Sequence, residues 1–117
     1  MEWKRYNIKN NIEFEIQNGN GNIKEYDCNG ILEFQGEYLI GNRNGKGKDY
    51  YNNGELKFEG EYLNGKRNGI GKEYFDNGNL KFEGIYLNGI IQFGKGYNIN
   101  GNFEYEIKIG NDNIKEY

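Results

Sequence analysis

Hydrophobic and polar residues alternate along this chain in short runs that are typical of β-strands. In the run 56–62, Phe58 and Tyr62 fall on one side of an extended segment, while the charged residues between them fall on the other. Such runs are separated by Asn-Gly dipeptides, a composition that favours tight turns between antiparallel strands. The pattern therefore predicts consecutive β-hairpins and no helix.

The alternating pattern recurs with a fixed period of 24 residues. The segment 60–71 is preceded by a copy at 36–47 and is followed by the start of another copy at 84–89. A fixed period of this kind is typical of a stacked array, in which each unit buries its face only against its neighbours. The chain is therefore predicted to be a repeat protein.

The spacing of Tyr62, Gly65, Gly69 and Gly71 resembles the repeat of the MORN family, specifically the lengthened form common in bacterial proteins. The resemblance is strong over residues 34–89 and partial outside that span. It implies an elongated antiparallel β-sheet with one hairpin in each repeat. It also implies binding rather than chemistry, because members of the family are adaptors, dimerisation modules or membrane-associated scaffolds.

We predict an all-β fold, an elongated single-layer antiparallel meander of stacked β-hairpins with about ten strands. The 117 residues are expected to form one domain. Residues 34–89 are its well-matched repeats, 1–33 a degenerate N-terminal copy or cap, and 90–117 a divergent C-terminal copy or cap. A last strand is predicted at 114–117.

Two features decide how the hairpins pair. If Asn77-Gly78 is a two-residue tip, Lys72 lies opposite Glu83; a three-residue bulged loop would shift this register by one, and both remain open. Glycine also recurs inside the predicted strands, where it costs roughly 0.5–1 kcal/mol relative to alanine. We expect each tyrosine ring to lie flat over the bare glycine backbone of a neighbouring strand and so to offset this cost.

Composition disfavours several classes of function. The formal charge is −3 and no block of Lys or Arg is present, which disfavours nucleic-acid binding and makes membrane association unlikely. The chain has one cysteine, Cys28, and no histidine, so we expect no zinc site, no cofactor and no enzymatic activity. The charged N-terminal residues do not form a signal peptide, which predicts a cytoplasmic protein.

The aromatic residues have two interpretations, which can both hold. The rings can form the core of the array, or some of them can line an open groove that contacts a partner. A further candidate is an irregular apolar loop that nothing in the repeat requires. The candidate binding residues are Tyr38, Tyr62, Tyr86, Tyr50, Tyr74, Ile90, Ile91 and Phe93.

The first functional hypothesis is a non-catalytic module that binds another protein through an aromatic sheet face and end loops. The acidic balance of charge favours a partner with a basic surface. One subclass is a small inhibitor, such as an immunity protein or a phage anti-defence protein that acts on a nuclease or effector. The alternative is a membrane-associated or phospholipid-associated scaffold. Unpaired edge strands leave edge-to-edge self-association open.

Overall fold

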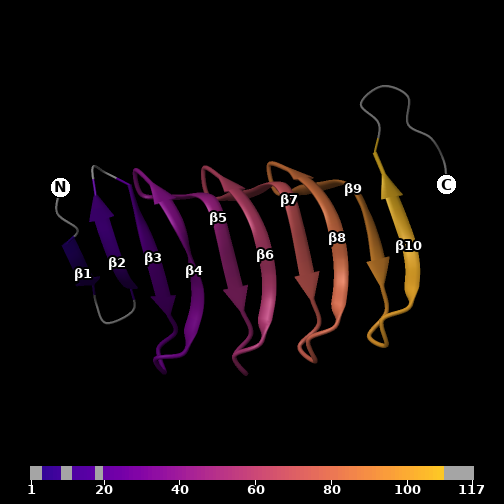
Figure 1. Ribbon diagram of the computed structural model, residues 1–117, viewed down its shortest axis with the longest axis horizontal. Helices are drawn as coiled ribbons and strands as arrows, with labels where there is room; N and C mark the ends of the chain where they lie inside the picture. Colours follow the sequence, from indigo (N-terminus) through magenta and orange to yellow (C-terminus); the bar gives the residue numbers. More distant parts are fainter. Residues whose placement is uncertain (1–3, 9–11, 18–19, 110–117) are drawn as a thin grey trace.

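The computed structural model describes residues 4–8, 12–17 and 20–109, with side chains for residues 21–109. In this part of the chain, ten strands form one antiparallel sheet in which each strand pairs with the next (Figure 1). The strands are β1 (Lys4–Ile8), β2 (Ile12–Gln17), β3 (Asn20–Tyr26), β4 (Leu32–Leu39), β5 (Asn42–Tyr50), β6 (Leu56–Leu63), β7 (Lys66–Tyr74), β8 (Leu80–Leu87), β9 (Ile90–Tyr97) and β10 (Phe103–Lys108). The predicted all-β meander is confirmed, while the strand predicted at 114–117 lies outside the described residues.

Two kinds of turn alternate along the chain, one kind at each end of the strands. Asn64 and Gly65, with φ of 51° and 86°, join the paired residues Leu63 and Lys66. These are the left-handed conformations of a two-residue type I′ turn, which Asn and Gly adopt more readily than other residues.

The turns at the opposite ends of the strands are longer and bulged. Gly78, with φ of 93°, donates its N–H to the carbonyl of Phe75 at 2.9 Å, and the N–H of Phe75 donates to Asn79 at 2.8 Å. This is the three-residue bulged loop, one of the two that the sequence left open. A further register shift beside Tyr74 still leaves Lys72 opposite Glu83. The pairing expected for the shorter loop therefore forms with the longer one.

One turn residue is strained. Ile40 has φ of 47° and is 83% exposed, whereas Asn64 and Asn88 occupy the equivalent positions in later turns. A β-branched residue in the left-handed region is costly. We expect Ile40→Asn to raise the free energy of unfolding by about 1 kcal/mol, measured by urea denaturation. The reverse change, Asn64→Ile, serves as the control and should lower it by a similar amount; equal stability in both variants would contradict the strain.

A continuous row of glycines crosses six strands, from β4 to β9. Its members are directly paired and are Gly36, Gly47, Gly60, Gly71, Gly84 and Gly94. Phenylalanine rings lie against this bare backbone. A Cβ atom placed on Gly71 would be 2.6 Å from Cζ of Phe58 and 3.0 Å from Cε1 of Tyr86. Rings therefore pack on the glycines as expected, but the closest rings are those of phenylalanine, with the tyrosine rings beside them.

The same face holds the core of the protein. Phe58 is fully buried, and its ring makes edge-to-face contacts with Tyr62 and Tyr86, at centroid distances of 5.7 and 5.6 Å. Arg67 covers the ring from outside, with its Cζ 3.8 Å from the ring centroid. The previous repeat is built alike, with Arg43 over Phe34 at 3.7 Å. Arginine side chains thus cover one face of a single-layer sheet.

Candidate functional site

Three of the candidate tyrosines lie in the core. Tyr62 and Tyr86 are only 5% and 3% exposed, and Tyr38 is partly buried against the same cluster. The hydroxyl of Tyr62 donates to Oδ2 of Asp49 at 2.5 Å, that of Tyr38 to Glu25, and that of Tyr86 to Glu73. The structure therefore leaves Tyr62 and Tyr86 little surface for a partner, and we assign all three a structural role.

These hydrogen bonds predict a loss of stability in alkali. Burial, followed by the bond to a carboxylate, raises the pKa of Tyr62 and of Tyr86 above the ordinary value of 10.0. Because the folded state holds the protonated form, this contribution is complete below about pH 10 and is lost as the pH rises further. The free energy of unfolding should fall above pH 10, at up to about 1.4 kcal/mol per pH unit for each tyrosine. Urea denaturation should show a shallower fall in the Tyr62→Phe/Tyr86→Phe variant; an unchanged slope would contradict the assignment.

Tyr50 and Tyr74 lie on the opposite face of the sheet and are partly buried there. The hydroxyl of Tyr74 donates to Oε2 of Glu59 at 2.6 Å, and burial together with this bond raises the pKa of Tyr74 to about 12. The hydroxyl of Tyr50 accepts a hydrogen bond from Nε2 of Gln35 at 2.8 Å. Both hydroxyls thus have partners on this face, which we call the outward face.

The residues predicted to form an irregular apolar loop lie instead in strand β9, where pairing with β8 divides them between the two faces. Ile91 is paired with Tyr86 and packs against the core, whereas Ile90 and Phe93 point outward and are 62% and 48% exposed. Phe93 is paired with Ile85, which is itself paired with Ile70. The apolar residues of β9 therefore continue across β8 and β7 on the outward face.

We call these adjoining outward side chains the apolar patch. Ile70, Ile85 and Leu87, which sequence reasoning missed, are 64%, 44% and 52% exposed. Leu87 is paired with Ile90, and it lies two residues from Ile85 on the same side of β8. The apolar patch consists of Ile70, Ile85, Leu87, Ile90 and Phe93.

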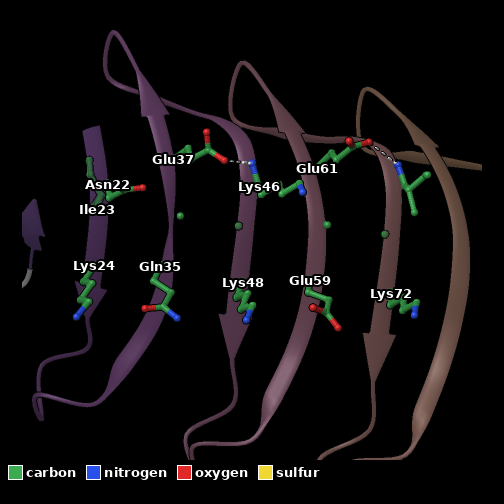
Figure 2. Close-up of a pocket in the computed structure, with 15 residues that line it drawn as sticks. Asn22, Ile23, Lys24, Gln35, Glu37, Lys46, Lys48, Glu59, Glu61 and Lys72 are labelled. Atoms are coloured by element: carbon green, nitrogen blue, oxygen red, sulfur yellow. Dashed lines mark hydrogen bonds between the residues drawn. The ribbon is translucent and has the colours of Figure 1, made fainter. Parts of the chain in front are cut away.

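A groove of about 700 Å³ runs beside the apolar patch on the outward face, across β3 to β7 (Figure 2). Its glutamates are engaged within the sheet: Glu37 accepts the backbone N–H of Lys46 at 3.0 Å, and Glu61 accepts that of Ile70 at 2.9 Å. Ile70 lines both the groove and the apolar patch, so the two surfaces are continuous.

The comparisons identify the repeat. Residues 58–80 match the MORN repeat, and residues 43–64 match the MORN repeat variant. The chain carries MORN repeats over residues 43–80. This confirms the family that the glycine and tyrosine spacing resembles. MORN repeats are generally non-enzymatic, and they are consistent with a non-catalytic repeat module. None of the curated proteins compared with the chain is similar to it in sequence.

The MORN repeats of this chain differ from one another on the outward face. Position 85 carries isoleucine where the two preceding copies carry Glu37 and Glu61, and Ile70 follows Lys46 by 24 residues. The sheet therefore forms with charged residues at these positions and does not require apolar ones. A comparison of the copies at outward positions would have found Ile70 and Ile85, because their signal is the departure from the repeat, whereas Leu87 repeats Leu39 and Leu63.

The described side chains do not gather into a metal-binding cluster. Among them, no group of three or more His, Cys, Asp or Glu residues could hold a metal ion. Cys28 is free and exposed at a hairpin tip, in the turn before β4. Over the same residues, no helix is long and apolar enough to cross a membrane.

Proposed function

We propose that this chain is a non-catalytic protein-binding module and that the apolar patch is its contact surface. The observation that supports the proposal is the change from Glu61 to Ile85 and from Lys46 to Ile70 between copies of one repeat. The core contacts are the same in kind, yet five large side chains are left 44–64% exposed. Contiguous exposed apolar surface of this kind is typical of interaction sites.

The surroundings of the apolar patch favour a protein partner over a lipid surface. Lys72, Glu83 and Lys95 are paired in sequence along one side of it, so positive and negative charges alternate there. A protein interface combines an apolar centre with such a polar rim, whereas an anionic membrane attracts clustered basic residues. Inhibition of a nuclease or effector, as by an immunity or phage anti-defence protein, is one form of this function, with a basic partner surface expected from the net charge.

A triple variant that replaces apolar residues of the apolar patch by charged ones tests this function. Ile70→Lys and Ile85→Glu restore the charged residues of earlier copies, and Phe93→Lys places a lysine opposite the new glutamate at position 85, so the fold should be retained. Tagged wild-type protein and this triple variant are used to capture proteins from an extract of the native host, followed by quantitative mass spectrometry. We expect the protein that the wild type captures to fall at least about ten-fold with the variant, since central apolar contacts carry most of the binding energy.

The control removes apolar surface elsewhere. Ile31 and Ile99 are 36% and 49% exposed but lie in turns, outside the apolar patch. The Ile31→Lys/Ile99→Lys variant should capture the same protein as the wild type. Equal capture by the triple variant, or an equal loss in the control, would exclude the apolar patch as the contact surface.

A further inference from the structure

A row of polar residues crosses the outward face beside the apolar patch, with one residue from each strand from β3 to β10. In order of pairing its members are Lys24, Gln35, Lys48, Glu59, Lys72, Glu83, Lys95 and Glu106. Neighbouring members are about 4.8 Å apart, as paired strands are. Lysine and glutamate alternate throughout the row, except at Gln35, and Figure 2 shows the part of the row on either side of it.

Gln35 takes the place of a glutamate without a change of structure. It precedes Glu59 by 24 residues, and each of the two residues bonds a tyrosine of the next strand. Tyr74 donates to Glu59 at 2.6 Å, whereas Gln35 donates to Tyr50 at 2.8 Å. The direction of the hydrogen bond is reversed, and one negative charge is missing from the row.

The missing charge leaves Lys24 and Lys48 without an acidic partner on the side that faces Gln35, whereas on its other side Lys48 is paired with Glu59. Lys24 and Lys48 flank Gln35 and line the groove, and within the described side chains neither has a carboxylate at ion-pair distance. Glu37, the nearest carboxylate along β4 that lines the groove, accepts the backbone N–H of Lys46. The groove therefore offers unused donors around a position that lacks one negative charge.

We propose that the position at Gln35 that lacks a negative charge, which we call the gap, binds a carboxylate from an acidic segment of the protein partner. One carboxylate restores the alternation of the row, and the open groove of about 700 Å³ gives it access. The groove reaches the apolar patch at Ile70, three strands from Gln35, a span of about 14 Å that four or five extended residues cover. The inference rests on the proposed function in taking the occupant to be a protein segment that also contacts the apolar patch; this one segment is acidic, and the basic surface expected from the net charge lies elsewhere on the partner.

Two opposite substitutions, Gln35→Glu and Glu59→Gln, test whether the gap binds a carboxylate, and decaglutamate is the probe. Fluorescently labelled decaglutamate is titrated with the protein in about 20 mM salt, where charge screening is weak, and its anisotropy is measured. Gln35→Glu supplies the missing carboxylate from the chain itself and should weaken binding about five-fold, as expected for one added like charge at this separation. Glu59→Gln opens a second gap between Lys48 and Lys72 and should strengthen binding by a similar factor. Each variant copies a residue that the neighbouring repeat already holds, so both should fold.

The outcomes separate this inference from the proposed function. Absence of decaglutamate binding to the wild type, or unchanged binding in both variants, overturns the carboxylate site even if the apolar-patch variant loses its partner. Decathymidylate that binds as tightly and responds alike would show a site for any polyanion and would overturn the assignment to an acidic peptide. If decaglutamate behaves as expected while the apolar-patch variant keeps its partner, the proposed function fails and the carboxylate site stands.

Discussion

Replacement of Gly71 by alanine is expected to lower the free energy of unfolding by about 1–3 kcal/mol, the usual cost of overpacking a core. The added Cβ would meet Cζ and Cε1 of Phe58 at 2.6 and 2.7 Å and Cε1 of Tyr86 at 3.0 Å. Neither ring can withdraw easily, because Arg67 lies over Phe58 and the hydroxyl of Tyr86 is held by Glu73. Urea denaturation of the purified variant measures the loss.

A double-mutant cycle shows whether the ring is the cause. Phe58→Leu removes the atoms that the new methyl group would meet, so Gly71→Ala should cost less in that background. We expect a coupling of about 0.5–3 kcal/mol, the range found for residues in contact. Strict additivity of the two substitutions, or full stability of Gly71→Ala alone, would show that the glycine row is not there to accept the rings.

Truncation of Phe58 to alanine should have the largest effect of any single change, a loss of about 3–5 kcal/mol. The side chain is fully buried, and its ring contacts Tyr62, Tyr86 and Arg67, so the variant leaves a cavity shared by two repeats. In an array that is stabilised only by neighbouring contacts, this cavity should separate the sheet into two weakly coupled halves. Chemical denaturation followed by far-UV circular dichroism gives the loss.

The matched control for Phe58→Ala is Phe93→Ala. Phe93 is 48% exposed and belongs to the apolar patch, so its truncation should change the free energy of unfolding by no more than about 0.5 kcal/mol. A similar loss of stability in both variants would contradict the division of the sheet into a buried core face and an exposed outward face.

Period and alternation were enough to predict the fold, because both are local properties of the chain. The pair Lys72–Glu83, which was expected for the two-residue tip, is present in the structure. The length of the bulged turns was not determined, because Asn77-Gly78 suits either loop and the register shift beside Tyr74 compensates for the longer one. Turn chemistry alone does not distinguish two loops that lead to the same pairing.

The candidate site was predicted less completely, for a physical reason. Alternation places Tyr62 and Tyr86 on one face but does not say what lies above them, and it is Arg43 and Arg67 that cover that face. In a single-layer sheet, burial of the rings depends on long side chains such as these arginines. A pattern that divides residues only into hydrophobic and polar counts arginine as polar. Ile90 and Phe93 were named because they interrupt the repeat, whereas Ile70 and Ile85 keep its spacing and change only its polarity.

Site-specific photocrosslinking tests most directly whether recognition occurs on the outward face. Benzoylphenylalanine is incorporated at Phe93, in the apolar patch, or at Tyr105, which is 42% exposed and lies over Gly96 on the core face at the same end of the sheet. After irradiation in the native host, we predict a crosslinked partner from position 93 and none from position 105. Crosslinking from position 105 alone, or equally from both positions, would contradict the account.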